Sequence, residues 1–485
     1  MKKILQGTVV VLLIFVFQAC RKETPDAPTT PTIPPVENTA MILPKKEMRA
    51  VWMATVWGLD WPEGKYSIDA QKKHYTDYLD RFKTLNINAV FVQVKGMGDA
   101  FYSSPYEPWS AAITGTRGTD PGYDVLQFMI DEAHARGIEF HAWMNPYRIA
   151  TRAGVNNSYP ALHESVNPAW VMSHEKIQIY NPALPEVRQR LADIVKDVIT
   201  KYEVDGIHFD DYFYPDPSSA GQMISDDADY NKYGASFSTK EDFRRANVDQ
   251  AIKGVHDVIV ATKPEVVFSV SPAPDPDYNY KTLFADVKKW NEQGWLDVVM
   301  PQLYQEIGNR FNDFQNRLTW WSQYNYKAAL MVGHGYYKFG DGTSPAAFQT
   351  TTELEKQFEL TRRNKKVVGN VLYSAKYIPL NKIGITTKLA EIFKHPSVIP
   401  FLGRAVAVAP VEPTNVKLEG SLLKWNTTGN IRTVVYFTAD LKKEAVVLTV
   451  TDKNEWPVSA PGHYAVTTLN IDSQESKLSV IAKKS

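Results

Sequence analysis

Short apolar runs recur between about residues 50 and 373, and each is followed by a loop and a helix-like stretch. Eight of these runs are predicted to be buried parallel strands, at 50–56, 89–94, 138–143, 206–209, 266–270, 298–301, 328–332 and 367–373. Helices are predicted between them, at 74–85, 123–136, 186–201, 240–262, 280–293, 311–324 and 351–362. Eight strands that alternate with helices are typical of the α/β class, as a (β/α)₈ TIM barrel.

A doubly wound open sheet would alternate in the same way. Such a sheet often carries a glycine-rich phosphate loop after its first strand. Here the first strand is followed by Trp-Gly-Leu-Asp-Trp-Pro at 57–62, which is not such a loop. The pattern therefore favours a barrel, which we place at residues 45–405.

The pattern changes after Arg404 to short segments of alternating polarity. A linker with two prolines, at 409–413, leads into predicted strands at 415–417, 421–425, 433–438, 445–449, 463–468 and 478–482. These predict a small C-terminal β-sandwich at residues 410–485, with Trp425 in its core. In its length and its pattern of short strands it is similar to fibronectin type III modules. We interpret it as a spacer, with sugar binding as the alternative.

The first 20 residues are typical of a targeting segment. Lys2 and Lys3 precede an apolar run at 9–17, which is too short to span a bilayer comfortably and ends close to Cys20. This resembles a bacterial lipoprotein signal, in which the cysteine is lipidated; an ordinary secretory signal is the alternative. Residues 21–44 are rich in proline and threonine and predict an extended tether. We therefore expect the protein at the bacterial cell envelope, lipid-anchored to a membrane.

Charge and composition narrow the class of partner. Lys and Arg together number 54, as do Asp and Glu, so the formal net charge is zero. This balance argues against a nucleic-acid partner, which favours a basic surface. The chain has 12 Trp and 25 Tyr, and flat rings suit the apolar faces of sugars, although any single ring can equally belong to the core.

Barrel active sites lie at the carboxyl ends of the strands, so polar and aromatic residues there are candidates for substrate binding. They are Trp57, Gln93, Lys95, His141, Trp143, Asn145, Arg148, His208, Tyr212, Gln302, Tyr304, His334 and Tyr373. Almost every predicted strand contributes one. Such a lining suits a polyhydroxylated substrate, so a glycan is the predicted partner.

Cleavage of a glycosidic bond generally needs two carboxyl groups. Asp210 is the favoured first carboxyl, because it follows the buried run 207–209 directly at the mouth of the barrel. The alternative for Asp210 is an ion pair with Arg148 or Lys95 that only orders the site. For Asp211, the next residue along the chain, a catalytic role and a structural role are about equally favoured. Asp205 lies at the bottom of the strand, where a turn or cap role is the better interpretation.

The second carboxyl is not fixed by the sequence. Glu306, after the sixth strand, and Asp275, after the fifth, rank equally, and each can also be a surface charge. His141, His208 and His334 lack the close spacing of metal ligands, so we expect neither a metal nor another cofactor. A metal-dependent deacetylase or esterase is a minor alternative.

Five motifs occur in order along the barrel. They are Glu-Met-Arg-Ala-Val-Trp-Met-Ala-Thr at 47–55, Phe-Val-Gln-Val-Lys at 91–95, His-Ala-Trp-Met-Asn-Pro-Tyr-Arg at 141–148, Asp-Gly-Ile-His-Phe-Asp-Asp-Tyr at 205–212 and Val-Met-Pro-Gln-Leu-Tyr at 299–304. Together they resemble the glycosyl-hydrolase-like family ten domain over roughly residues 45–400. The resemblance implies a TIM barrel on a bacterial envelope protein and places Asp210 and Asp211 on the family's fourth-strand acidic motif.

At least one relative of this kind cleaves peptidoglycan strands stripped of their stem peptides. Two departures leave the substrate open, because Lys95 stands where arginine is common and Gln305 where an aromatic residue is common. We therefore predict a glycoside hydrolase that acts on an envelope or extracellular glycan, with denuded peptidoglycan as one candidate. The alternative is a surface lipoprotein that binds glycans without cleaving them.

Overall fold

The computed structural model describes residues 40–485, apart from 154–155, 222, 325–326, 405–407, 430 and 471–472. The expected signal segment, Cys20 and all but the end of the tether lie outside these described residues. Within the described ranges, no helix is both long enough and apolar enough to cross a membrane.

Eight parallel strands close into a barrel in the order β1-β11-β10-β9-β8-β7-β3-β2. Their bounds are β1 (Met48–Met53), β2 (Ala89–Lys95), β3 (Glu139–Met144), β7 (Gly206–Phe209), β8 (Val267–Val270), β9 (Val298–Val299), β10 (Ala329–His334) and β11 (Val367–Tyr373). The predicted barrel is confirmed. The clearest difference is β1, which ends before residue 56 because the backbone N–H of Ala54 donates to the Asp60 carboxylate at 2.7 Å. The chain then turns into a short 3₁₀ helix, η1 (Val56–Gly58).

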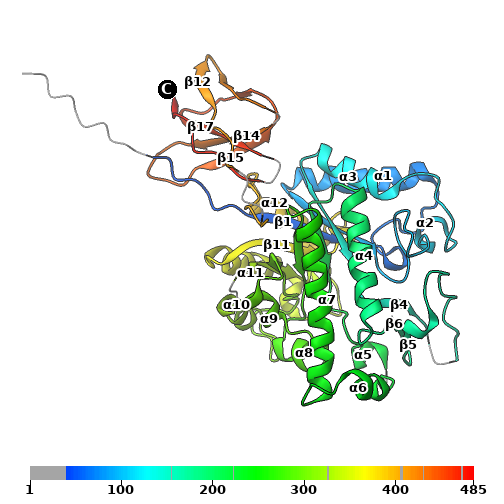
Figure 1. The fold of residues 1–485 in the computed structure, drawn as a ribbon. Coiled ribbons are helices and arrows are strands. Elements are labelled where there is room, and N and C mark those ends of the chain that lie inside the picture. The colour runs from blue at the N-terminus through cyan, green and yellow to red at the C-terminus, as the bar shows by residue number, and fades with distance from the viewer. Residues whose placement is uncertain are drawn as a thin grey trace, which may run out of the picture. The chain divides into compact units, whose positions relative to one another are not determined.

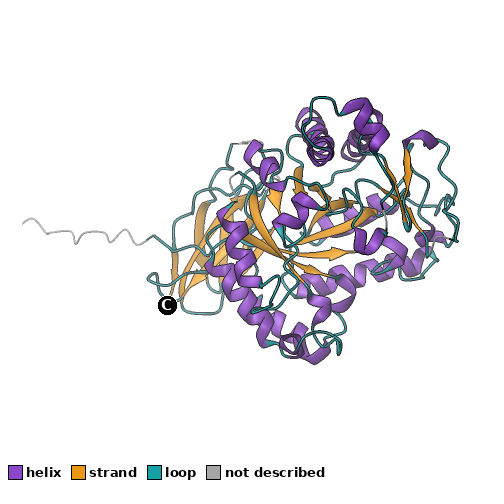
Figure 2. Ribbon diagram, turned by 90° about the horizontal axis from the view of Figure 1, so that it is seen from below, coloured by secondary structure: helices purple, strands orange, loops and turns teal. Residues whose placement is uncertain are grey.

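Helices surround the strands, as Figure 2 shows, and α4 and α7 lie side by side (Figure 1). The helices of the barrel are α1 (Ile68–Thr84), α2 (Ala111–Thr114), α3 (Val125–Ala135), α4 (Pro185–Lys201), α5 (Pro217–Ala220), α6 (Asp227–Tyr233), α7 (Lys240–Thr262), α8 (Pro276–Lys281), α9 (Val287–Gln293), α10 (Phe314–Gln323), α11 (Thr352–Arg363) and α12 (Ile385–Ile392). The single helix predicted at 280–293 was wrong. Phe284 has a left-handed φ of 52°, and Asp286 caps a new helix, α9, by accepting from the N–H of Lys289.

A second sheet branches from the barrel after β3 and was not predicted. It consists of β4 (Arg148–Thr151), β6 (Ile177–Tyr180) and β5 (Val171–Ser173), paired antiparallel in that order. Because β4 begins at Arg148, this sheet fixes the backbone just beyond the carboxyl end of β3.

The strands alternate between two apolar layers, as the two-residue period of a strand requires. Trp52, Phe91 and Met331 pack together inside the barrel. Ile207 and Phe209 belong instead to the layer between strands and helices. Asp210 therefore shares the inner face with His208, two residues earlier, and does not continue the face of Ile207 and Phe209.

Gly206 is expected to be intolerant of a larger side chain. A Cβ at this position would lie 2.1 Å from Nδ1 of His141 and 2.9 Å from the carbonyl oxygen of Val267. The His141 ring stacks on Phe91 at 4.3 Å between centroids, which hinders its movement. We expect Gly206→Ala to lower the free energy of unfolding by about 1–3 kcal/mol, measured by urea denaturation.

A matched control is Gly254→Ala in α7, where nothing lies within 4 Å of the added Cβ. Alanine is the better helix former, so this variant should be stabilised by up to about 1 kcal/mol. Equal midpoints for Gly206→Ala and the unaltered protein would contradict the packing described for the barrel interior.

The C-terminal region forms two antiparallel sheets, consistent with the predicted small sandwich. One contains β12 (Thr414–Glu419), β13 (Leu422–Asn426) and β16 (Glu455–Pro457), and the other contains β15 (Val446–Thr451), β14 (Arg432–Thr438), β17 (Gly462–Leu469) and β18 (Ala482–Lys484). Trp425 is 2% exposed and packs with Leu423 and Val466, as expected for a core tryptophan. The likeness to fibronectin type III modules and the spacer role stay predictions.

The strand predicted at 478–482 was wrong for most of its length. Beside β17, the N–H of Ser479 donates to the carbonyl of Val466, while the Ser479 hydroxyl accepts from the N–H of Val466 at 3.0 Å. A side chain thus takes the place of a backbone ladder partner. Regular pairing with β17 resumes only at Ala482.

Candidate active site

Asp210 stands on the inner face of the barrel directly after β7, with only 3% of its surface exposed. Its Oδ2 accepts from the indole N–H of Trp143 at 3.0 Å, and its Oδ1 accepts from Nδ2 of Asn145 at 3.1 Å. The backbone N–H of Tyr212 also points to Oδ1, at 3.4 Å. A carboxylate surrounded by donors on several sides is held in one orientation and is best satisfied when ionised.

Two opposing influences act on the charge of Asp210. Burial is the larger influence and raises the pKa of its carboxyl above the ordinary value, although the positive charge of Arg148 and the hydrogen bonds from Trp143, Tyr212 and Asn145 oppose this shift. Arg148 is itself buried, and its guanidinium lies 3.9 Å above the ring centroid of Tyr212. The backbone N–H of Arg148 donates to Oδ1 of Asn145 at 2.8 Å, which holds the backbone at this position.

Asp211 is mostly buried, although less completely than Asp210. Burial and the neighbouring negative charge of Asp210 raise the pKa of Asp211 to about 7, against the opposing hydrogen bond from Gln302. The donors around Asp210 favour its ionised form, and its negative charge helps to raise the pKa of Asp211, so Asp210 ionises before Asp211. Pairs of this kind are the usual arrangement for acid and base work at one site.

Lys95 is not the ion-pair partner that the sequence offered for Asp210. Its Nζ donates to the carbonyl of Met97 at 2.9 Å and lies 4.0 Å from Oε1 of Glu107. Lys95 is completely buried. Its positive charge interacts with Asp99 and Asp210, and its complete burial contradicts the predicted direct contact with a substrate.

Tyrosines line the part of the barrel mouth that is formed by the carboxyl ends of β9, β10 and β11. The rings of Tyr304 and Tyr373 stack with 5.7 Å between centroids and an interplanar angle of 18°, and Tyr337 meets both edge-on. Trp52 contacts Tyr304 and Tyr373 through T-shaped contacts. Tyr212, 42% exposed, is near enough to Asp211 for the two groups to influence each other's charge. This aromatic wall, made of Tyr304, Tyr337 and Tyr373, offers flat apolar surface beside the carboxyl pair.

Three predicted substrate-binding residues are instead buried supports. His334 faces the helices, with Nδ1 2.9 Å from Gln357 Oε1 and Nε2 2.9 Å from Asn370 Oδ1. His141 lies low in the barrel, against Glu139 and Phe91. Oε1 of Gln93 accepts from the backbone N–H groups of Thr55 and Val56, so this side chain anchors η1. Strand alternation and depth in the barrel, which the sequence does not reveal, account for the differences.

His208 lies beneath Asp210 and is fully buried. Its Nε2 accepts from the indole N–H of Trp52 at 3.1 Å, so the ring proton sits on Nδ1, 2.9 Å from the hydroxyl of Ser269. Burial lowers the pKa of His208 well below its ordinary value, so the ring is neutral. His208 therefore supports the floor of the site, and the prediction of substrate contact is corrected.

Asp275, one of the two predicted partner carboxyls, is a structural residue. Its Oδ1 accepts from the N–H of Asp277 and caps α8, while its Oδ2 pairs with Arg317 at 2.7 Å. Glu306 stays a candidate: its Oε1 accepts from Asn309 at 2.9 Å, and its Oε2 is buried without a hydrogen-bond partner. Asp205 caps the bottom of the barrel, as expected, by accepting from the N–H of Phe140 at 2.6 Å.

Two further carboxyl groups were not assigned from the sequence. Asp60 accepts from the Ser374 hydroxyl at 2.9 Å, and burial raises the pKa of Asp60 to about 6. Asp99 lies after β2, where nothing in the local pattern marks it. Within the described ranges, no group of three or more His, Cys, Asp or Glu side chains could hold a metal ion.

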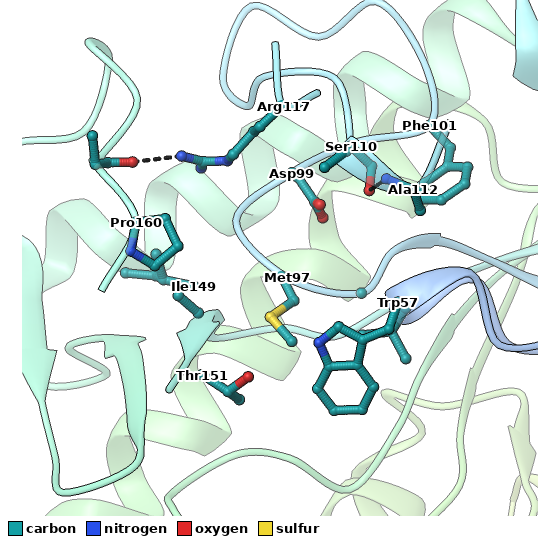
Figure 3. A pocket seen from close by; sticks show the side chains of 15 residues that line it. Trp57, Met97, Asp99, Phe101, Ser110, Ala112, Arg117, Ile149, Thr151 and Pro160 are labelled. Carbon is teal, nitrogen blue, oxygen red and sulfur yellow. Dashed lines mark hydrogen bonds between the residues drawn. The ribbon is translucent and has the colours of Figure 1, made fainter. Parts of the chain in front are cut away.

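Asp99 and Trp57 line a cavity of about 210 Å³ between η1, the loop after β2 and β4 (Figure 3). Trp57 is 67% exposed, in keeping with its predicted role as a substrate contact. Through Lys95, which bonds both Met97 and the carbonyl of Asn145, the loop that lines this cavity is joined to the support of Asp210.

Comparison with known proteins agrees with the motif resemblance. The model of the family described as Glycosyl hydrolase-like 10 matches residues 47–347. The glycosyl hydrolase YngK of Bacillus subtilis (strain 168) is 37% identical over 404 residues, which cover 78% of this chain and 79% of the relative. The glycosyl hydrolase DigH of Escherichia coli (strain K12) is 34% identical over 413 residues, covering 76% of this chain and 92% of the relative.

The family model spans most of the barrel, including both aspartates and the aromatic wall up to Tyr337. Together with the two relatives, this match supports a glycosidase-type role for the enzyme. From its fold, its motifs and these relatives, the chain belongs to the glycosyl hydrolase-like 10 family.

Proposed function

We propose that this protein hydrolyses glycosidic bonds in a glycan chain bound across the mouth of its barrel, with Asp211 as the proton donor and Asp210 as the ionised partner. The observation that carries the proposal is the contrast between the two groups. Asp210 accepts from Trp143 and Asn145, which favours its ionised form although burial raises its pKa too, and its negative charge helps to raise the pKa of Asp211 to about 7. A glycosidase needs one protonated and one ionised carboxyl at the scissile bond.

In the proposed reaction, the Asp211 carboxyl donates its proton to the glycosidic oxygen as the bond from that oxygen to the sugar's C1 breaks. Positive charge then develops on the sugar ring. The Asp210 carboxylate stabilises this charge because Trp143 and Asn145 hold it in place before the reaction begins. Water completes the reaction, giving a new hemiacetal on one product and a hydroxyl on the other.

The aromatic wall supplies the binding energy for the neighbouring sugars in this proposal. Tyr304 and Tyr373 are only partly buried and stack on each other, so their outer edges and faces are available to the apolar side of a sugar. As substrate we propose a β-linked glycan of the bacterial envelope or its surroundings. Denuded peptidoglycan is the first one to test, following the resemblance of the five motifs.

We also propose a place for the reaction. The sequence before the barrel predicts lipidation of Cys20 and a tether at 21–44, which would hold the enzyme at an envelope membrane. An anchored enzyme on a tether reaches an insoluble polymer near the membrane. The support for this is the sequence alone, because Cys20 lies outside the described residues.

The direct test is the release of new reducing ends by the full chain in detergent, from denuded peptidoglycan strands and from chitin and cellulose oligosaccharides. We expect products whose masses sum to the substrate plus one water, and no release by Asp211→Asn. Stable binding with no product after long incubation would replace the proposal by a glycan-binding lipoprotein. Release of acetate that stops on chelation would point to a metal-dependent deacetylase.

A further inference from the structure

The cavity beside Trp57 has a composition unlike that of an ordinary surface dimple. Figure 3 shows Asp99 and Met97 pointing into the space between Trp57 on one side and Ile149 and Pro160 on the other. Among the described residues that line it, Asp99 is the one carboxylate. The lining also includes Arg117, Ser110 and Thr151, so the site combines one carboxylate and a few other polar groups with apolar walls and one flat aromatic edge.

Trp57 is held at this cavity in a strained backbone conformation. Its φ of 56° is left-handed, which is costly for a large residue. The strain is maintained by Gln93, whose Oε1 accepts from the N–H groups of Thr55 and Val56 immediately before it. Strained backbone persists where its surroundings enforce it, and here the outcome is an indole 67% exposed at the edge of the cavity.

The charges around Asp99 indicate what kind of group it can receive. Burial raises the pKa of Asp99, while a hydrogen bond from Ser110 and the positive charges of Lys95 and Arg117 lower it. The Arg117 guanidinium is fixed by bonds to the carbonyls of Gly98 and Ala161. The negative charge of Glu107 also acts on Asp99, so the charges around the carboxylate are close to balanced, and a further cation such as a sugar ammonium group would add an uncompensated charge.

A neutral N–H donor satisfies the acceptor without adding charge, and the apolar walls favour a methyl group next to it. We propose that this cavity is a glycan subsite for the acylamino group of a 2-acetamido sugar, with its N–H donating to Asp99 and its methyl group against Met97 and Ile149. Trp57 then packs on the face of the sugar ring. The inference rests on the proposed function and narrows its substrate class.

The location suits a subsite next to the scissile bond. Nζ of Lys95 donates to the carbonyl of Met97 in the cavity wall at 2.9 Å and lies 3.4 Å from the carbonyl of Asn145. The side chain of Asn145 in turn bonds to Asp210. The cavity and the carboxyl pair therefore share one rigid frame, with the aromatic wall on the opposite side of the barrel mouth.

The test measures binding without turnover, by calorimetry on the full chain carrying Asp211→Asn. The probes are the β-1,4-linked hexamer of N-acetylglucosamine, its fully deacetylated form and cellohexaose. We expect the acetylated hexamer to bind about ten-fold more tightly than the other two, and Asp99→Ala in the same background to abolish that preference. Asp99→Asn should keep part of it, because its amide oxygen still accepts.

Asp277→Ala is the matched control, because Asp277 is a surface carboxyl on α8 that pairs with Lys281 at 2.9 Å, away from the cavity. Equal binding of the three chains, tighter binding of the deacetylated hexamer, or uniform weakening of all three by Asp99→Ala would overturn the proposal. If the preference depends on Asp99 but the unaltered protein releases no reducing ends, the subsite stands and the hydrolase does not. If the unaltered protein cleaves glycans but shows no such preference, the hydrolase stands and the subsite does not.

Discussion

Replacing Asp210 by asparagine is expected to lower kcat/KM on a cleavable glycan by about 10³-fold or more. The substitution keeps the size of the side chain but removes the negative charge that faces the developing positive charge of the sugar. It also replaces one of the two acceptor oxygens by an NH2 donor, opposite either the N–H of Trp143 or that of Asn145, which approach the carboxylate at 3.0 and 3.1 Å. The measurement is steady-state release of reducing ends from the best substrate of the unaltered protein.

Asp275→Asn is the matched control, because Asp275 follows the neighbouring strand but is committed to capping α8 and to Arg317. We expect its kcat/KM to change by only a few-fold. Undiminished turnover by Asp210→Asn would remove Asp210 from the mechanism. Circular dichroism and a thermal midpoint within a few degrees of the unaltered protein would show that a loss of activity is not a loss of fold.

The barrel was predictable because parallel strands covered on both faces read as short apolar runs at regular intervals. Because both faces of such a strand are apolar, the sequence does not show which face each residue occupies. In β10 (Ala329–His334) the residues on both faces are apolar, so the sequence gives no sign that Gly333 points inward and His334 outward. The position of Asp210 at the barrel mouth was predicted from the strand-end rule, but its place on the inner face was not.

The parts of the site that the sequence missed come together from distant loops. The cavity joins Trp57 after β1, Asp99 after β2 and Ile149 in β4, and no local period links these residues. Stacking of Tyr304 on Tyr373 needs the barrel to bring β9 to within two strands of β11. Glu306 and Asp275 ranked equally because a loop carboxyl's partners, such as Arg317, are visible only once the helices are in place.

Asp211→Ala is expected to reduce kcat/KM on an ordinary glycan about 10²- to 10⁴-fold, and much less on an aryl glycoside whose leaving group needs no proton. For the unaltered protein, kcat/KM should fall as pH rises above about 7, because the proton donor is then ionised. This alkaline fall should be absent from Asp211→Ala acting on the aryl glycoside. An equal loss on both substrates would mean that Asp211 is not the acid.

The same raised pKa has a consequence for stability that needs no substrate. A carboxyl whose pKa is higher in the folded than in the unfolded protein favours the fold at low pH. It loses that contribution as pH rises from its ordinary value near 3.8 through about 7. Asp211→Asn cannot ionise, so it should gain thermal stability relative to the unaltered protein at pH 8.5 but not at pH 5.5, by at least about 2 °C in the difference. A pH-independent difference would show that Asp211 is already ionised in the folded protein at pH 5.5. In that case the proton donor would have to be another group at the barrel mouth, of which Glu306, with one buried oxygen unpartnered, is the first to substitute.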